Sequence, residues 1–247
     1  MKDEIVLITG GSGLIGAKII NELNNCNYNL YFTSRSFKNI KEIENKYKNS
    51  KLFVKGIRVD FENDNFLKIF EKFYKTNTPP SAIINNVRNV NNLKVENGVT
   101  SINFFQKELN LNVIVPYSLS IYHSNTNYLK KIINISSIYG IVPPNFNLYL
   151  DKYNSSPIQY GVSKAALIHL TKELAVRFSE KKILVNAVSY GGVNGRVTSA
   201  FEKKYSRLTP INKMLNLDDV ATPILFLLTN NYINGHNLII DGGYTIW

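Results

Sequence analysis

The chain has 247 residues, 44% of them hydrophobic, and a formal net charge of +11. This length fits one large α/β domain or two small ones, with enough apolar material for a core. The single Cys26 excludes an intramolecular disulfide framework and a cysteine-based zinc cluster, and it favours a reducing compartment. We expect no metal site.

The basic charge fits a nucleic acid, a membrane surface or an anionic small molecule as partner, and equally a genome rich in lysine and asparagine codons. Basic residues are dispersed in doublets such as Lys130-Lys131, without the long runs of a nucleic-acid tail. An apolar segment follows the first four residues directly, and no apolar run approaches the ~20 residues that span a bilayer. We therefore expect a cytoplasmic protein that binds neither nucleic acid nor membrane.

Short β-branched runs alternate with longer amphipathic segments along the whole chain. Strands are expected at 5–8, 29–33, 53–59, 82–84, 131–135, 183–188 and 237–240. Helices are expected at 15–24, 37–48, 64–74, 100–120, 161–179 and 220–228. Uniformly apolar strands that alternate with helices predict parallel βαβ units with both sheet faces covered. The predicted fold is a doubly wound parallel α/β sheet with helices on both faces, formed as a single domain over 1–247.

Two long segments have an irregular composition. Residues 87–99 are rich in asparagine, and residues 141–159 hold three prolines between aromatic residues. Loops of this length often form lids or substrate walls. We expect the second segment to be an inserted substrate loop.

A glycine-rich turn follows the first strand, with the sequence Thr9-Gly10-Gly11-Ser12-Gly13-Leu14-Ile15-Gly16. Glycines at 11, 13 and 16 give the pattern G-x-G-x-x-G directly before a helix. They permit a tight turn, let the backbone approach a pyrophosphate and bring the helix N-terminus toward the anion. The position of the turn predicts a dinucleotide site.

The end of the second strand indicates which dinucleotide binds. A carboxylate there binds the ribose 2′-hydroxyl, whereas a basic residue accommodates a 2′-phosphate. Here Ser34 and Arg35 are followed by no acidic residue until Glu42. Arg35, with Ser36 and Lys38 nearby, favours NADP(H), and the alternative is an ordinary exposed arginine.

Tyr160 and Lys164 stand four residues apart at the start of a predicted helix, where residues at this spacing share a face. A tyrosine with an ordinary pKa near ~10 is a poor acid or base at neutral pH. A neighbouring lysine cation favours the phenolate. The pair is typical of general acid–base catalysis, although the isolated pattern is common by chance.

Eight ordered segments resemble the short-chain dehydrogenase/reductase family over essentially the whole chain. They are the turn at 9–16, Val59-Asp60-Phe61, Asn85-Asn86, Asn112 to Tyr117, Asn134-Ile135-Ser136-Ser137, Tyr160 to Lys164, Val185 to Ser189, and the ending with Asp241-Gly242-Gly243-Tyr244. The resemblance implies a Rossmann-type fold and a homodimer or homotetramer.

The resemblance also implies roles for individual residues. Tyr160 corresponds to the general acid that protonates a reduced carbonyl oxygen, and Ser137 to the hydroxyl that polarises the carbonyl. Lys164 would bind the nicotinamide ribose, and Asn112 would hold a water that links Lys164 to solvent. Ser136 and Asn110 are the neighbouring alternatives to Ser137 and Asn112. The implied cofactor contacts are Gly10, Ser12, Gly13, Ile15, Gly16, Ser34, Arg35, Asp60 (adenine amino group), Phe61, Asn86 (adenosine ribose), Lys164 and Val193.

The chain departs from the family pattern at several positions. Its glycines at 10, 13 and 16 have the spacing of longer sugar-nucleotide-modifying members. Arg88 replaces the glycine of the usual N-N-A-G, where it either pairs with a substrate phosphate or carboxylate or points to solvent. Tyr190 replaces a usual proline and is expected to line the substrate pocket. The long spacing between Ser137 and Tyr160 resembles members of bacterial surface-sugar and flagellin-glycan biosynthesis.

The resemblance implies an NADP(H)-dependent oxidoreductase that interconverts a carbonyl and a secondary alcohol on an anionic sugar or sugar nucleotide. A 3-oxoacyl-carrier-protein reductase is the alternative enzyme, and its acidic partner would also suit a basic surface. A nucleotide-binding regulator without turnover is the alternative from another class, and the complete set Asn112, Ser137, Tyr160 and Lys164 argues against it.

Overall fold

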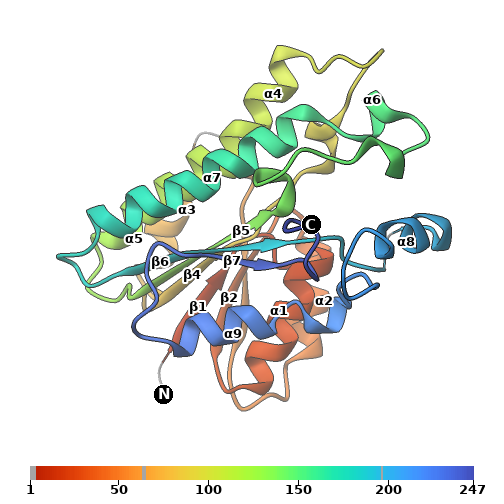
Figure 1. Ribbon diagram of the computed structural model, residues 1–247. Helices are drawn as coiled ribbons and strands as arrows, with labels where there is room; N and C mark the ends of the chain where they lie inside the picture. Colours follow the sequence, from red (N-terminus) through yellow and green to blue (C-terminus); the bar gives the residue numbers. More distant parts are fainter. Residues whose placement is uncertain (1–3, 63–64, 196) are drawn as a thin grey trace.

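One parallel sheet holds all seven strands in a computed structural model that describes residues 4–62, 65–195 and 197–247 (Figure 1). The strands are β1 (Ile5–Ile8), β2 (Asn29–Ser34), β3 (Val54–Arg58), β4 (Ala82–Asn85), β5 (Lys131–Ser137), β6 (Leu184–Tyr190) and β7 (Asn237–Ile240). Their order across the sheet is β3-β2-β1-β4-β5-β6-β7. The predicted doubly wound parallel sheet is confirmed, and its switch point between β1 and β4 is where such sheets bind ligands.

Helices cover both faces of the sheet. They are α1 (Leu14–Asn25), α2 (Phe37–Lys46), α3 (Phe66–Phe73), α4 (Ile102–Leu109), α5 (Val115–Ser124), α6 (Lys152–Ser155), α7 (Ile158–Arg177), α8 (Ser199–Ser206) and α9 (Thr222–Thr229). In Figure 1, α1, α2 and α9 lie below the sheet, and α3, α4, α5 and α7 lie above it. The predicted start of α3 at Asp64 lies outside the described residues.

The core forms two layers because side chains alternate across each strand. Val6 and Ile8 of β1 pack with the layer that includes α1 and α9. Ile5 and Leu7 of the same strand pack with the layer that includes α3, α5 and α7. Burial of each such side chain contributes about 1.5–3 kcal/mol, so the two layers together fix the strand ends that form the site.

The long helix predicted around 100–120 is present over 102–124, but its α-helical hydrogen bonding is interrupted. A π-helical turn at Asn110–Ile114 separates α4 from α5. Pro116 lacks the N–H group that would close an α-helical hydrogen bond to the Asn112 carbonyl. The Asn112 side-chain nitrogen also donates to the Glu108 carbonyl at 3.2 Å. Such turns are frequent at functional sites, and this one carries the predicted Asn112.

The two irregular segments contain short helical turns. Residues 87–99 include a 3₁₀ turn at Val90–Leu93, and residues 141–159 include a 3₁₀ turn at Phe146–Leu148 and the helix α6. The helix α8, which follows β6, was not predicted. Its N-cap Thr198 accepts a hydrogen bond from the Phe201 backbone at 3.3 Å, a local capping signal that the sequence contains.

Candidate active site

A cleft of about 460 Å³ opens at the carboxyl ends of the parallel strands. Its wall includes the glycine-rich turn after β1 and residues that follow β2, β3, β4 and β6. Ser137 of β5 and Tyr160 and Lys164 of α7 complete it. The topology therefore gathers residues from most of the chain at the edge where open α/β sheets bind ligands.

The glycine-rich turn packs too closely for side chains at two positions. Gly10 has a φ of +67°, and a Cβ there would lie 2.9 Å from the Val87 Cα. A Cβ on Gly16 would lie 2.5 Å from the Gly10 carbonyl oxygen. Among the described residues, no side chain caps the first turn of α1 after Gly13. The turn thus leaves backbone N–H groups free to hold a phosphate.

Hydrogen bonds from β2 and β4 hold this turn in place. Thr33 Oγ1 accepts from the Gly10 backbone at 2.9 Å. Thr9 Oγ1 accepts from the backbone N–H groups of Asn86 at 2.9 Å and Val87 at 3.0 Å. The Asn86 side-chain nitrogen donates to the carbonyl oxygens of Thr9 at 3.1 Å and Gly10 at 3.3 Å. Asn86 lines the cleft, and its amide nitrogen braces the turn.

The ends of β2 and β3 form the outer part of the cleft. Arg35, Asp60 and Phe61 all line it, together with Ser34, whose hydroxyl lies 2.9 Å from that of Ser12. The Asp60 carboxylate accepts from the Glu62 backbone at 3.1 Å. Arg35 is exposed, and no ion pair involves it within the part of the chain that the structure describes. Its guanidinium is therefore free to meet an anion.

Three of the four predicted catalytic residues, Ser137, Tyr160 and Lys164, line the cleft, and the fourth, Asn112, contacts the lysine. The Lys164 ammonium donates to Asn112 Oδ1 and to the Ile135 carbonyl, both at 2.9 Å. It lies 5.9 Å from the centre of the Tyr160 ring. Asn112 is buried behind Lys164 and does not line the cleft. The π-helical turn therefore supports the lysine from behind.

The two candidate serines differ in their contacts. The Ser136 hydroxyl donates to the Lys164 carbonyl at 3.1 Å and so joins β5 to α7. The Ser137 hydroxyl accepts from the Tyr139 backbone at 3.3 Å, and its own proton has no partner among the described groups. This difference favours Ser137 as the hydroxyl that meets a ligand. Asn110, the alternative to Asn112, is absent from the hydrogen bonds of Lys164.

Burial changes the ionisation of the lysine. Lys164 is 6% exposed, and this burial lowers its pKa to about 8. The nearby negative charge of Glu108 opposes the decrease, and the positive charge of Arg88 adds to it. Lys164 is therefore mainly charged at neutral pH and loses its charge in the mildly alkaline range.

Arg88 lies at the mouth of the catalytic end. Its guanidinium carbon is 5.0 Å from the centre of the Tyr160 ring, a cation–π arrangement, and the residue lines the cleft. Arg88 is exposed and lines the cleft beside Tyr160, so either of its two predicted roles fits this position.

Tyr190 has a contact with the core as well as a place in the cleft wall. It borders the cleft, but it is buried and its hydroxyl donates to the Val220 carbonyl. Burial raises the Tyr190 pKa far above its usual value. The hydroxyl is therefore committed to the core, and only the ring can contribute to the wall.

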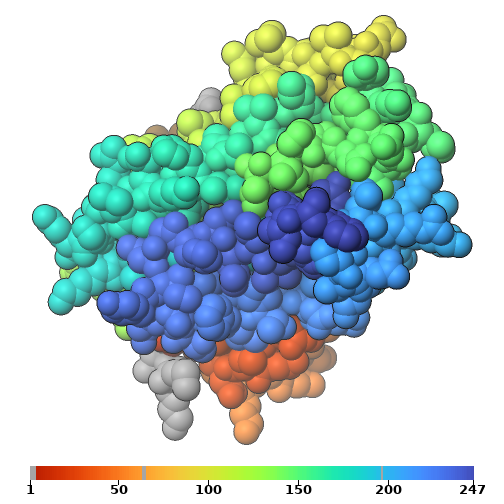
Figure 2. Space-filling model, viewed as in Figure 1, coloured from red at the N-terminus to blue at the C-terminus, as the bar shows by residue number. Residues whose placement is uncertain are grey.

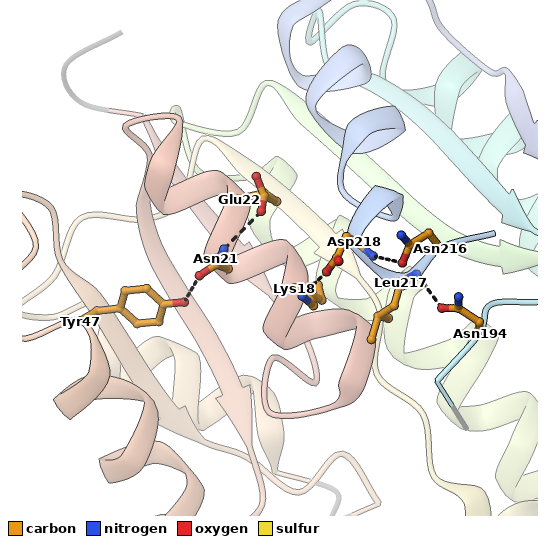
Figure 3. Close-up of polar contacts among 8 residues, drawn as sticks. All are labelled: Lys18, Asn21, Glu22, Tyr47, Asn194, Asn216, Leu217 and Asp218. Atoms are coloured by element: carbon orange, nitrogen blue, oxygen red, sulfur yellow. Dashed lines mark hydrogen bonds and ion pairs between the residues drawn. The ribbon is translucent and has the colours of Figure 1, made fainter. Parts of the chain in front are cut away.

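The loop after β6 is held against α1, as Figure 3 shows. The Leu217 backbone donates to Asn194 Oδ1 at 3.0 Å, next to Val193, which lines the cleft. Lys18 of α1 forms an ion pair with Asp218 in the same segment. This link fixes Val193 relative to the helix that begins at the glycine-rich turn.

The inserted segment packs against α8 and the C-terminal residues, which adjoin it in Figure 2. The hydroxyls of Tyr139 and Tyr149 are 2.7 Å apart, and Tyr149 lies against Phe201 of α8 with ring centres 5.8 Å apart. Tyr205 stacks on Tyr244 at 5.1 Å. Burial raises the Tyr149 pKa, with a contribution from the nearby Tyr160. The insertion thus contributes Tyr149 to an aromatic cluster near Tyr160.

Two functional contacts escaped the sequence analysis. Glu108 is buried and accepts from the Asn112 side chain at 2.6 Å, and the spacing of four residues was the available signal. Gln159, also buried, accepts from the Thr100 hydroxyl at 2.7 Å and donates to the Asn92 carbonyl at 3.0 Å. Gln159 therefore ties the 87–99 segment to the residue before Tyr160.

Within the described ranges, no cluster of three or more His, Cys, Asp or Glu residues is placed to hold a metal ion. Among the helices described, none combines the length and apolar character that a membrane crossing requires.

A family model described as enoyl-(acyl carrier protein) reductase matches residues 12–245. The fold and the family match define a nicotinamide-dependent class of oxidoreductases, and the chain belongs to the short-chain dehydrogenase/reductase family.

Curated relatives match over different extents. The 7alpha-hydroxysteroid dehydrogenase of Paraclostridium sordellii is 28% identical over 100% of this chain and 93% of its own length. The 3-oxoacyl-[acyl-carrier-protein] reductase FabG of Buchnera aphidicola is 28% identical over 97% and 96%. The post-translational flagellin modification protein A of Campylobacter coli is 32% identical, but over 46% of this chain and 45% of that protein.

Solved structures match the whole fold. A short-chain dehydrogenase from Leptospira borgpetersenii with bound NAD⁺ has a TM-score of 0.85 and 28% identity, over 100% of this chain and 94% of that one. ElxO with NADP bound has a TM-score of 0.82 and 30% identity, over 98% of each chain. These two structures contain different nicotinamide cofactors, so likeness alone does not select between them.

Proposed function

We propose that this protein is an NADP(H)-dependent oxidoreductase that interconverts a carbonyl and a secondary alcohol on an anionic sugar or sugar nucleotide of surface-glycan biosynthesis. The observation that carries the proposal is the catalytic end of the cleft, where Tyr160 lies next to Lys164 and Lys164 is held by Asn112. Ser137 lines the same cleft. A regulator without turnover would have no need of this buried polar group.

The cleft fits a dinucleotide. The uncapped start of α1 and the close approach at Gly16 provide a phosphate site, and ElxO binds NADP in the same fold. Arg35 at the end of β2 favours a 2′-phosphate over a free 2′-hydroxyl. The cofactor would supply hydride when bound.

The side chains of this chain would manage the proton. Tyr160 would donate its phenolic proton to the carbonyl oxygen during reduction and accept it back during oxidation. Ser137 would donate a hydrogen bond to the same oxygen and stabilise the developing negative charge. Lys164, fixed by Asn112 and the Ile135 carbonyl, would hold the ribose and keep a positive charge beside Tyr160.

The substrate class rests on the mouth of the cleft. Arg88 presents a guanidinium beside Tyr160, and guanidinium groups bind phosphate and carboxylate through two parallel hydrogen bonds. The aromatic cluster around Tyr149 lies near Tyr160, where aromatic rings and hydroxyls would suit a glycosyl group. The likeness to a flagellin modification protein over about half of the chain adds support.

A 3-oxoacyl-carrier-protein reductase is the second candidate. It is favoured by the full-length likeness to the FabG protein of Buchnera aphidicola and by the basic charge of +11, which suits an acidic carrier protein.

One assay separates the two enzymes. Oxidation of NADPH is followed with phosphorylated keto-sugars, keto-sugar nucleotides and acetoacetyl thioesters in parallel. The proposal predicts turnover with the anionic sugars and a KM for them that rises when Arg88 is replaced by Ala. Turnover confined to the thioesters would establish the second candidate instead.

We also propose that the protein forms a homodimer or homotetramer. Ile114, Tyr117 and Val162 are exposed apolar side chains on the π turn, α5 and α7, the helices that lie above the sheet. Light scattering on the purified protein tests this, with Tyr117→Asp expected to reduce the oligomer, and a monomeric wild-type protein would refute it.

A further inference from the structure

Glu108 is the most completely buried carboxyl group near the site. It stands on the last turn of α4 and is 0% exposed. One oxygen, Oε1, accepts from the Asn112 side chain at 2.6 Å. The other, Oε2, is buried without a partner among the described groups. Burial of an ionised carboxyl group without a full set of hydrogen-bond partners lowers the stability of the folded protein, unless a nearby charge compensates it.

The compensating charge lies on the far side of Asn112. The Asn112 amide donates to Glu108 through its nitrogen and accepts from the Lys164 ammonium through its oxygen, at 2.6 Å and 2.9 Å. A carboxylate, an amide and an ammonium thus form a continuous chain. The amide is oriented so that both charged groups strengthen its hydrogen bonds.

Few other charges face this chain. On α7 the neighbouring ionisable group is Tyr160, and the loops after β4 and β3 contribute Arg88 and Glu62. Lys107 on α4 itself is exposed. Burial raises the Glu108 pKa, while Lys164 and Arg88 oppose that increase. For Lys164, the nearby Glu108 is the group that opposes the effect of burial.

We propose that Glu108 is a positioning residue of the catalytic site, the buried counter-charge that keeps the Lys164 ammonium protonated through the Asn112 amide. The carboxylate does not touch a ligand. It acts by stabilising the charge and orientation of the lysine from behind. The packing of α4 against α7 accounts for the burial of Glu108, and its contact with Asn112 accounts for the positioning role.

Glu108→Gln separates charge from hydrogen bonding. Glutamine keeps an oxygen that accepts from Asn112, so a purely structural role survives the change. Urea midpoints are measured at pH 7 for the wild type, Glu108→Gln, Lys164→Met and the double variant. The proposal predicts that Glu108→Gln lowers the midpoint in the wild-type background and leaves it unchanged or raises it when Lys164 is Met. An equal decrease in both backgrounds, or none in either, would overturn it. Glu71→Gln, on the exposed face of α3, is the matched control and leaves the midpoint unchanged.

A pH profile gives the second readout, and this one rests on the proposed function. The affinity for NADPH should fall in the wild type around pH 8, where Lys164 loses its charge. In Glu108→Gln the midpoint of this fall should move lower by about one pH unit or more. Glu108→Asp, which keeps the charge on a shorter side chain, should lie closer to the wild type than Gln, and the opposite order would refute the counter-charge role. If the wild type binds no nicotinamide cofactor, the proposed function fails. The urea midpoints of the wild type, the two single variants and the double variant still decide the role of Glu108.

Discussion

The two halves of the cleft are built by different means. In the half that follows β1, the shape comes from backbone packed against backbone at Gly10 and Gly16, where any side chain would clash. In the half around Lys164, the shape comes from buried polar side chains, Glu108 and Asn112 among them. The first half depends on the absence of side chains, and the second on their contacts across α4, β5 and α7. Substitutions should therefore separate cofactor binding from turnover.

The largest effect is expected for Tyr160→Phe. Removal of the hydroxyl deletes the general acid, so turnover should fall by about 10²–10⁴-fold. The affinity for NADPH should stay within a few-fold of the wild type, because the phosphate site lies in the other half of the cleft. Steady-state kinetics and calorimetry measure both quantities. Retained turnover would remove Tyr160 from the catalytic role.

Acid stability should depend on a residue outside both halves. His123 of α5 is buried, its Nδ1 lies 2.8 Å from the Leu119 carbonyl and its Nε2 lies 3.0 Å from the Tyr74 hydroxyl. Burial lowers the His123 pKa from 6.5 to about 4. Between these pH values the unfolded chain binds a proton that the folded chain does not. The free energy of unfolding should therefore fall as the pH drops from 6.5 to 4, by on the order of 3 kcal/mol.

The His123 contribution is isolated by a difference measurement. Urea unfolding of the wild type and of His123→Gln is compared across this pH range. The advantage of the wild type over the variant should shrink on acidification and then become constant below pH 4. Parallel curves would mean that His123 does not stay neutral in the folded protein.

Gly16→Ala should damage the cofactor half. The new Cβ would lie 2.5 Å from the Gly10 carbonyl oxygen and 2.8 Å from the Gly11 Cα, and overpacking of this kind costs about 1–3 kcal/mol. The affinity for NADPH should fall together with the unfolding midpoint. Gly13→Ala is the matched control, because its Cβ would lie 3.3 Å from the same oxygen, and its effect should be smaller. An equal effect of the two variants would contradict the close-approach explanation.

Arg35→Ala should have the smallest effect. It should remove the preference for NADPH over NADH by about tenfold, which is ~1.4 kcal/mol. The effect is limited because the guanidinium is exposed and solvent weakens its attraction for a phosphate. Calorimetry with both cofactors measures the change. Equal affinities of the wild type for NADPH and NADH would refute the proposed cofactor preference.

Sequence reasoning predicted most of the fold because the strands are apolar and the turns are local. The runs Ile5–Ile8 and Ala82–Asn85 are buried at every position, as a parallel sheet covered on both faces requires. The π turn was missed because it depends on two effects at once, the missing N–H of Pro116 and the side-chain bond of Asn112 to the Glu108 carbonyl. Helical periodicity reports neither effect.

The site was predictable to a similar degree. The glycine-rich turn and the Tyr160–Lys164 pair are local patterns, and the structure brings both to one cleft. The partnership of Glu108 with Lys164 could not be predicted, because an acidic residue on a helix is usually solvated and only the packing of α4 against α7 buries this one. The contact of the Tyr190 hydroxyl with the Val220 carbonyl was also not predicted, because the two residues are distant in sequence.

The most direct test of the central proposal follows the hydride. NADPH that carries deuterium at the transferable position of the nicotinamide is supplied with the phosphorylated keto-sugar that is turned over fastest, and the product is analysed by mass spectrometry. We expect one deuterium at the new carbinol carbon with the wild type and almost none with Tyr160→Phe over the same time. NADPH bound tightly in the cleft, with no label appearing in any carbonyl substrate, would contradict the proposed oxidoreductase activity.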